Sequence, residues 1–395
     1  MSPNINSRTC ANFISSLFLN SDEWNSSLCH LFSGTFTISL ICLRDTIKKI
    51  NASLYENIFI VDNLNDISQL NKYHIEDYKF DFVYSFSEFN QLYAGRISDY
   101  YNIPGISEKK IQFLQNKYCV RDILRKNKLS CIDSEIVQNL EEVKRFILKE
   151  GFPIIIKPNR GIGGKDIHKI TNFTELSKMT IDTNTLVEKF IEGKEYSVES
   201  FTFENETSVF TVTEKIKDKN LSEVGHIIPA LLDTEIVKKI QFFVSKMNKI
   251  LGLTNTVNHT EIIISKDGAI ELVETHCRMG GDMIGKLMEN SFDYNIVDYW
   301  GQSIRENKQL TQKPKWNGLY SSIHYVFPEK PGILKEIKIP NDLDSLNISI
   351  LKNVGDHVVN VGNTNRVLSL IYESPSYSEV SSISKKLNEI EIEVD

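Results

Sequence analysis

Two glutamates stand at matching distances on either side of a short Asp-Gly pair, and together they could hold a metal ion. Asp267-Gly268 lies between two apolar runs, which is the strongest short-range signal for a two-residue hairpin turn. If these two residues form the turn, Glu261 lies directly opposite Glu274. Carboxylates placed this way are about 5 Å apart and repel each other. The pattern therefore predicts a compensating charge: a shared proton, a nearby arginine or a bound cation.

The same register brings three more polar side chains to the face that carries the two glutamates. His259 pairs with His276, and Arg278 follows on the same side because side chains alternate along a strand. Two acids together with substrate phosphates suit Mg²⁺, a hard cation. Two other interpretations of this segment stay open: an exposed hairpin face with scattered charges, and a zinc ion held by two histidines and two glutamates. A bulge of one residue would undo the register.

A glycine-rich loop between two short strands predicts a place for phosphate groups. The apolar run 153–156 ends in Lys157, and the loop 159–165 leads to a return strand at 167–170. Glycines let backbone N–H groups approach phosphate oxygens, while the lysine supplies positive charge. The loop glycines are Gly161, Gly163 and Gly164. The loop is not a Walker A motif, since Asn159 replaces the first glycine and Asp166 follows the loop lysine. A tight turn without a ligand is the alternative.

An acidic linker after the next apolar strand could receive the adenosine part of a nucleotide. Glu188 ends the strand, and Glu195 follows a Glu192-Gly193 turn. We expect Glu188 and the neighbouring backbone to face an adenine edge, with Glu195 placed for ribose hydroxyls. Taken alone, the segment is also typical of an ordinary strand–turn–strand unit with solvent-facing acids.

Three further residues are candidates for contacts with a substrate. Glu88 follows the strand at 80–84, where the carboxyl end of a sheet can meet a cleft, although an acid at a helix N-terminus is the plainer role. His226 precedes Ile227-Ile-Pro229 in an expected substrate loop. Gly281 offers a backbone N–H to a carboxylate or phosphoryl oxygen, or simply ends the strand.

The elements that position these residues follow from hydrophobic periodicity. Apolar runs at 57–61 and 80–84 indicate buried parallel strands, and a helix is expected from about 87 to 101. Strand followed by helix, repeated, predicts a small doubly wound sheet. Further helices are expected at 107–127, 139–150, 231–251 and 377–387. Further strands are expected within 152–203 and 255–277. The first 55 residues give no clear pattern.

Length and composition indicate a soluble globular protein of two or three domains. The 395 residues are too many for one small core, and 41% hydrophobic with 25% charged residues is ordinary. A net charge of -7 argues against nucleic acid and anionic membrane as partners. The one short basic run, Lys215 to Lys219, is expected to be a solvated or substrate-facing edge. Scattered cysteines, and a sequence without signal-peptide or membrane-spanning patterns, predict a cytoplasmic protein.

Taken in order along the chain, these motifs resemble the ATP-grasp superfamily. Within it, His259-Thr-Glu261 and Glu274-Thr-His-Cys-Arg278-Met-Gly-Gly-Asp282 look most like the carboxylate–amine ligases, including bacterial L-amino acid ligases. The resemblance covers roughly residues 107–310. It implies an α/β and α+β multidomain protein with an ATP-grasp fold. The implied parts are a Rossmann-like pre-ATP-grasp domain (1–106), two ATP-grasp subdomains (107–185 and 186–315) and a small C-terminal α+β segment (316–395).

The resemblance also implies roles for individual residues. Glu261 and Glu274 match the two magnesium carboxylates, and Arg278 matches the arginine that stabilises an acyl phosphate. The implied nucleotide contacts are Lys117 and Lys157 as the ATP lysines, the glycine loop over the phosphates, Glu188, Lys189, Phe190 and Ile191 as the adenine linker, and Glu195 at the ribose. His276 stands where many members have an asparagine metal ligand. Because imidazole is a poor Mg²⁺ ligand, we expect His276, like His259, to line the substrate site.

The activity implied by the resemblance is the joining of a small carboxylate to a small amine. ATP and Mg²⁺ are the implied cofactors, an acyl phosphate is the implied intermediate, and ADP and phosphate are released. A homodimer is the expected assembly. Two alternatives stay open: a kinase of the same fold that phosphorylates a small molecule, and a non-catalytic nucleotide-binding module. Acidic, apolar and basic amino acids all remain open as substrates.

Overall fold

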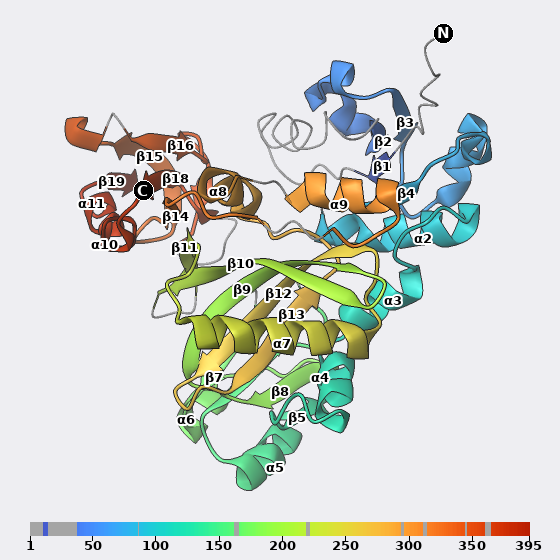
Figure 1. Ribbon diagram of the computed structural model, residues 1–395. Coiled ribbons are helices and arrows are strands. Elements are labelled where there is room, and N and C mark those ends of the chain that lie inside the picture. Colours follow the sequence, from blue (N-terminus) through green and yellow to red (C-terminus); the bar gives the residue numbers. More distant parts are fainter. Residues whose placement is uncertain are drawn as a thin grey trace.

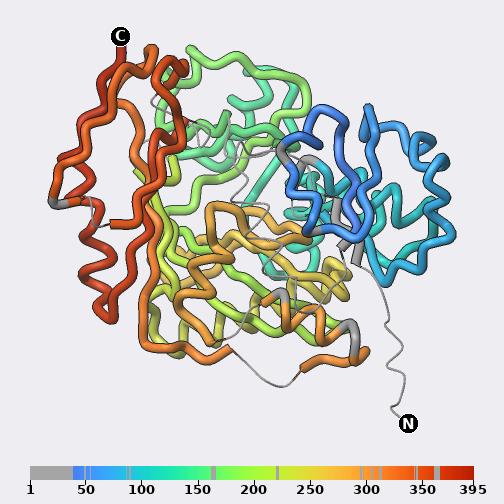
Figure 2. Tube along the Cα trace, turned by 90° about the horizontal axis from the view of Figure 1, so that it is seen from above, coloured from blue at the N-terminus to red at the C-terminus, as the bar shows by residue number. Residues whose placement is uncertain are grey.

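The N-terminal part of the chain lies beside a central sheet, and the C-terminal part adds strands to that sheet (Figure 1). A view from above places them on opposite sides of the molecule (Figure 2). The computed structural model describes residues 11–14, 38–85, 87–161, 166–218, 222–293, 296–310, 314–343, 346–359 and 365–395. Gly163 and Gly164 lie outside the described residues. Within the described ranges, no helix is long and apolar enough to cross a membrane.

The N-terminal part contains a parallel sheet of four strands in the order β3-β2-β1-β4, a doubly wound order. The strands are β1 (Ala11–Ile14), β2 (Ile38–Leu43), β3 (Asn57–Val61) and β4 (Phe82–Tyr84). The parallel strand predicted at 57–61 is confirmed, while the one predicted at 80–84 is shorter. The expected helix after it begins as a 3-10 turn at Glu88–Asn90 and continues as α2 (Gln91–Tyr101).

The helical stretch predicted at 107–127 is two helices. These are α3 (Glu108–Leu114) and α4 (Lys117–Lys126). Asn116 causes the break, because its side chain accepts a hydrogen bond from the backbone N–H of Cys119 and so caps a new helix. The break places Lys117 at the first turn of α4.

A four-stranded antiparallel sheet carries the glycine-rich hairpin. Its strand order is β5-β8-β6-β7. The strands are β5 (Ser134–Val137), β6 (Ile154–Pro158), β7 (His168–Ile170) and β8 (Thr185–Lys189), with helices α5 (Leu140–Glu150) and α6 (Phe173–Leu176). Buried apolar side chains from α5 and α6, such as Phe146 and Leu176, pack on the sheet. The predicted return strand after the glycine-rich loop pairs with β6 as expected.

An eight-stranded antiparallel sheet forms the centre of the molecule, in the order β13-β12-β9-β10-β11-β14-β18-β16. Its strands are β9 (Gly193–Phe203), β10 (Glu206–Lys217), β11 (Glu223–Ile228), β12 (Thr256–Ser265), β13 (Ile270–His276), β14 (Tyr320–Val326), β16 (Asn347–Ile350) and β18 (Leu368–Ser374). The amphipathic helix α7 (Thr234–Leu251) runs along one face (Figure 1), where Val244 and Met247 are buried against Val198 and Ile262.

The remaining elements close the other side of this sheet. Helices α8 (Ile284–Ser291) and α9 (Ile296–Glu306) contribute Leu287 and Trp300 to a second buried core with Phe201. The C-terminal residues add α10 (Tyr377–Ser382), α11 (Ser384–Leu387), and a small sheet of β15 (Gly332–Lys338), β17 (His357–Val358) and β19 (Glu391–Val394). The central sheet thus includes strands on both sides of residue 316.

Candidate active site

The hairpin of β12 and β13 places Glu261 opposite Glu274 and His259 opposite His276. The expected pairing is therefore confirmed, but the predicted turn is wrong. Ile264 pairs with Ile270 and the backbone N–H of Ser265 bonds to the carbonyl of Ala269, so the loop is three residues long. Its last residue, Gly268, has a positive φ of 82°, as such loops require.

A bulge in the same hairpin restores the expected register. Between Glu261 and Ile262 the pairing shifts, so that Ile262 faces Leu272 while Glu261 faces Glu274. Val273 is the extra residue on β13. The longer loop displaces the register by one residue and the bulge displaces it back. The two carboxylates therefore face each other because of a bulge that the sequence did not reveal.

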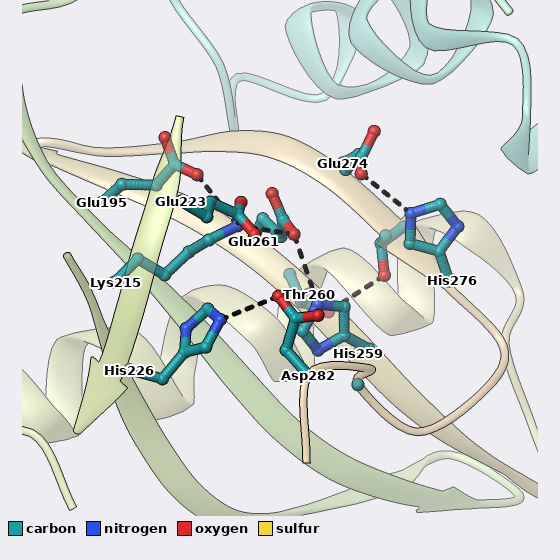
Figure 3. Close-up of polar contacts among 12 residues, drawn as sticks. Glu195, Lys215, Glu223, His226, His259, Thr260, Glu261, Glu274, His276 and Asp282 are labelled. Carbon is teal, nitrogen blue, oxygen red and sulfur yellow. Dashed lines mark hydrogen bonds and ion pairs between the residues drawn. The ribbon is translucent and has the colours of Figure 1, made fainter. Parts of the chain in front are cut away.

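Glu261 lies beside a buried lysine (Figure 3). The Lys215 Nζ is 2.7 Å from Glu261 Oε1, 3.0 Å from Glu195 and 2.5 Å from Glu223. The side chain of Lys215 is only 1% exposed. The expectation of a solvated edge is thus wrong at Lys215, because β10 is an interior strand of the sheet. The alternative, a substrate-facing position, stays a prediction.

Glu274 has a different set of positive neighbours. Lys117 Nζ lies 3.1 Å from Glu274 Oε2, and His276 Nε2 lies 3.1 Å from Glu274 Oε1. Lys117 also donates a hydrogen bond of 2.9 Å to the carbonyl of Gly161, the first glycine of the glycine-rich loop. Lys117 thus connects the loop expected over the phosphates to one of the two carboxylates expected on the metal.

The positive neighbours keep both carboxylates ionised. Burial alone would raise the pKa of the Glu261 carboxyl, but Lys215 and His259 outweigh burial and hold that pKa well below its ordinary range. Burial likewise opposes ionisation of Glu274, yet His276 and Lys117 lower its pKa to about 2. Both groups are therefore anionic at neutral pH and can act as oxygen ligands.

His259 is positioned by a buried carboxylate that the sequence did not single out. Its Nδ1 lies 2.5 Å from Glu199 Oε1 and its Nε2 lies 3.3 Å from Glu261 Oε1. Burial would lower the pKa of His259, but Glu199 and Glu261 raise that pKa to about 9. The second oxygen of Glu199 accepts the backbone N–H of Gly280 at 3.0 Å. Glu199 therefore fixes both the histidine and the loop that follows β13.

Arg278 forms an ion pair with Glu88 from the N-terminal part. Its Nε lies 2.8 Å from Glu88 Oε2, and the same oxygen lies 2.8 Å from His276 Nδ1. Glu88 also accepts a hydrogen bond from Gln115. Burial opposes ionisation of Glu88, but His276 and Arg278 lower its pKa far below the ordinary range. The geometry brings Glu88 into the site through these two residues, and its expected contact with substrate stays a prediction.

Lys157 and Glu188, the lysine and the acid expected at the nucleotide, are paired with each other. Lys157 Nζ is 2.5 Å from Glu188 Oε2, and Arg121 Nε is 3.0 Å from Glu188 Oε1. The Lys189 side chain points elsewhere, because it donates hydrogen bonds to the carbonyls of Glu150, Gly151 and Phe152 at the end of α5. Only the backbone of Lys189 is thus placed for the expected adenine contact.

The other expected nucleotide residues also have partners within the protein. Phe190 lies under the ammonium group of Lys169 on β7, 3.9 Å from Nζ to the ring centroid. Glu195, the expected ribose acid, lies between Lys215 and Lys217. The role of Ile191, like those of the other linker residues, stays a prediction.

His226 contacts the residue that ends the Arg278 motif. Its Nε2 lies 3.0 Å from Asp282 Oδ2 (Figure 3). Asp282 also accepts two hydrogen bonds, of 2.6 and 2.8 Å, from Arg366 in the C-terminal part. Arg366 in turn stacks on the ring of Tyr325. No local pattern marks Arg366, because its partner is 84 positions away in the chain.

The two glycines after Arg278 have different surroundings. A Cβ on Gly280 would lie 2.7 Å from His259 Nδ1 and 2.9 Å from Glu199 Oε1. A Cβ on Gly281 would have no neighbour within 4 Å. Gly280 therefore permits close packing of the loop on His259, whereas Gly281 faces open space where a substrate group could approach.

The donor set fits a hard divalent cation. Glu261 and Glu274 are anionic and opposite each other. The nearby oxygens of Glu195, Glu223 and Glu261 surround the ammonium group of Lys215 instead of an open position. Both ring nitrogens of His259 and of His276 already face carboxylates. The histidines thus serve as ion-pair partners of the acids, which favours Mg²⁺ over zinc.

Comparisons with known proteins give one family and several relatives. Residues 150–286 match the family model described as an ATP-grasp domain. The chain is 21% identical over 324 residues to an L-arginine-specific L-amino acid ligase of Bacillus subtilis. This alignment covers 77% of this chain and 78% of the relative. It is 25% identical to alanine–anticapsin ligase of Bacillus subtilis strain 168, over about half of each protein, 49% and 48%. An L-amino acid ligase structure from Bacillus licheniformis superposes with a TM-score of 0.82 at 16% identity, covering 98% of this chain and all of the other.

Residues 150–286 thus match an ATP-grasp domain, and the fold resembles that of an L-amino acid ligase. Both sequence relatives are ligases.

Proposed function

We propose that this protein is an ATP-dependent ligase that joins a carboxylate to an amine through an acyl phosphate and releases ADP and phosphate. The observation that carries the proposal is the pairing of Glu261 with Glu274 on the face that also holds Arg278. The same face receives Lys117 from the nucleotide side. One site thus combines acids for a cation with positive groups for the transferred phosphoryl group.

The chemistry requires charge neutralisation more than a nucleophile. A carboxylate does not react with an amine, because oxide is a poor leaving group, whereas an acyl phosphate loses phosphate readily. Glu261 and Glu274 would hold Mg²⁺, which supplies Lewis-acid stabilisation of the phosphoryl oxygens. Lys117, Lys157 and Arg278 would neutralise the negative charge on the transferred group.

Several residues of the site would change partners when ATP binds. Lys117 now donates to Gly161, and Lys157 now pairs with Glu188. Phosphate oxygens are stronger partners for lysine than a carbonyl group, so both ammonium groups would turn to the nucleotide. The loop that begins at Gly161 would then cover the phosphates and exclude water from the acyl phosphate.

Amino acids are the proposed substrates. The named relatives act on amino acids, and the site offers acids for an ammonium group and Arg278 with the Gly281 backbone for a carboxylate. Glu88, His226, His259 and His276 would line this part of the site. The division of the chain at residues 106, 185 and 315 is likewise proposed.

Hydroxylamine trapping tests the proposal. Purified protein is incubated with Mg-ATP, one amino acid at a time from a panel, and hydroxylamine. An acyl phosphate yields a hydroxamate, and we expect one to form together with ADP. Phosphorylated product without hydroxamate would identify a kinase instead, and release of AMP with pyrophosphate would contradict the mechanism.

A further inference from the structure

Arg121 is a buried arginine on α4 whose guanidinium group contacts two other elements. Its side chain is 4% exposed. Nε donates to Glu188 Oε1 on β8 at 3.0 Å, and Nη2 donates to the carbonyl of Leu272 on β13. Nη1 lies 3.5 Å from Glu271 Oε2. These contacts fix the guanidinium plane, because a planar fork with several donors fits only one orientation.

Glu188 divides its two oxygens between two cations. Oε1 faces Arg121 and Oε2 faces Lys157, and the carboxylate side chain is only 5% exposed. Burial would raise the pKa of Glu188, yet Arg121 and Lys157 lower it to about 2. The group is therefore a fixed anion that accepts hydrogen bonds and donates none.

A buried carboxylate needs a positively charged partner that remains in contact with it when a ligand binds. Removing one partner from a buried ion pair leaves an uncompensated charge, which is strongly unfavourable. If Lys157 were the sole partner, turning it toward a phosphate group would leave Glu188 in that state. Arg121 cannot turn in the same way, because its other nitrogens are bound to Leu272 and Glu271. Glu188 is thus paired with one cation that can turn away, Lys157, and one that cannot, Arg121.

We propose that Arg121 is the permanent counter-ion of Glu188: it holds this carboxylate toward the amino group of adenine and frees Lys157 for the phosphates. The inference rests on the proposed use of ATP. An anionic acceptor favours adenine, whose exocyclic amino group donates hydrogen bonds. Guanine has a carbonyl oxygen at that position, and two facing acceptors repel. Arg121 is thus a positioning residue that sets base selectivity without touching the nucleotide.

Nucleotide binding without turnover tests this role. Dissociation constants of ATP and GTP are measured by calorimetry for the wild type, Arg121→Gln and Arg121→Lys. We expect Arg121→Gln to weaken ATP binding roughly 10- to 100-fold and GTP binding much less, since hydrogen bonds to charged groups are the strong ones. Arg121→Lys keeps the positive charge but lacks the planar group with several donors. The ratio of its dissociation constants for ATP and GTP should therefore lie between those of the wild type and Arg121→Gln.

Arg125→Gln is the matched control. Arg125 lies one turn further along α4 and is 40% exposed, paired with Asp133. Its removal should leave both dissociation constants unchanged. An unchanged ATP-to-GTP ratio in folded Arg121→Gln would overturn the proposal.

A double variant covers the case in which Arg121→Gln does not fold. Arg121→Gln/Glu188→Gln removes both charges of this ion pair and leaves Glu271 with its hydrogen bonds from Ser130 and Cys131. This variant should bind ATP and GTP alike. A double variant that still prefers ATP as the wild type does would also overturn the inference. Wild-type protein that binds ATP but makes no hydroxamate would contradict the ligase proposal and leave Arg121 in its role. Wild-type protein that binds neither nucleotide would contradict both.

Discussion

Glu88 and Arg278, 190 positions apart in the chain, form an ion pair with 2.8 Å between Oε2 and Nε. The same oxygen of Glu88 faces His276, which in turn faces Glu274. A carboxylate of the N-terminal part thus supports both the arginine and one metal carboxylate of the proposed mechanism.

Replacing Glu88 by glutamine should slow the reaction without weakening nucleotide binding. The amide cannot neutralise Arg278 and His276 together. Outer partners of catalytic groups typically contribute roughly 10- to 100-fold in activity, and we expect a loss of that size in kcat/KM. Phosphate release and ATP affinity are measured side by side, with exposed Glu76→Gln as control. An equal loss of ATP affinity would indicate a general structural defect.

Removing either facing carboxylate should abolish the Mg²⁺ dependence of turnover. For Glu261→Gln and Glu274→Gln we expect phosphate release to fall at least roughly 100-fold, because a positive charge at the transferred phosphoryl group is lost. Asp267→Asn, at the exposed tip of the same hairpin, should behave as the wild type. Phosphate release titrated with Mg²⁺ provides the measurement, and full activity of Glu274→Gln would refute the metal assignment.

The two glycines after Arg278 give a matched pair of alanine variants. Gly280→Ala should lower the free energy of unfolding by about 1–3 kcal/mol, since its Cβ would overlap His259 and Glu199. Gly281→Ala should unfold as the wild type does, because its Cβ meets open space. Urea unfolding distinguishes the two. Equal destabilisation of both variants would mean that the loop packs differently.

His259 should make the metal-free protein less stable at alkaline pH. Its pKa of about 9 lies above the ordinary value of 6.5, because Glu199 and Glu261 outweigh burial. The stabilisation is complete below pH 6.5 and is lost as pH rises through about 9. It amounts to about 3 kcal/mol at most. Urea unfolding in EDTA at pH 6.5 and 9.5 measures it, and His259→Gln should flatten the profile. If the free energy of unfolding of His259→Gln still falls between pH 6.5 and 9.5 as that of the wild type does, another group causes the effect.

Arg366 should support the loop that follows Arg278. Because Asp282 accepts two of its hydrogen bonds, Arg366→Gln should destabilise the protein by about 1.5–3 kcal/mol. We also expect a several-fold higher KM for the amino acid substrates and an unchanged KM for ATP. Adding Asp282→Asn removes the acid that has lost Arg366 and keeps only His226 as its partner, and should restore part of the stability. If the KM for ATP rose as much as the KM for the amino acid, the substitution would not act through the loop that follows Arg278.

The sequence pattern predicted those parts of the site that are formed by residues close to one another in the sequence. The pairing of Glu261 with Glu274 followed from an Asp-Gly turn, although the loop and the Val273 bulge shift the register in opposite directions. The parallel strand at 57–61 and the glycine hairpin followed from apolar runs. These features depend on neighbours in sequence, and periodicity reports such neighbours.

The partners of the charged groups did not follow from the sequence. Lys215 was expected at an edge but lies among three carboxylates from three strands. Arg121 and Arg366 meet acids 67 and 84 positions away. Such pairings depend on which strands become neighbours in the central sheet, and one sequence carries no local signal for that order. The Lys189 side chain likewise supports α5 because the linker passes close to the end of that helix.

The continuity of the central sheet from β13 to β16 limits how the protein can be engineered. β14 pairs with β11, so His226 is the register partner of Ile323 across the boundary at which a C-terminal module would be exchanged. A chimera that takes this module from another ligase must supply a strand that matches β11, and also an arginine for Asp282. A swap that ignores both would open the sheet beside the site. Transplanting the C-terminal part is therefore an active-site redesign.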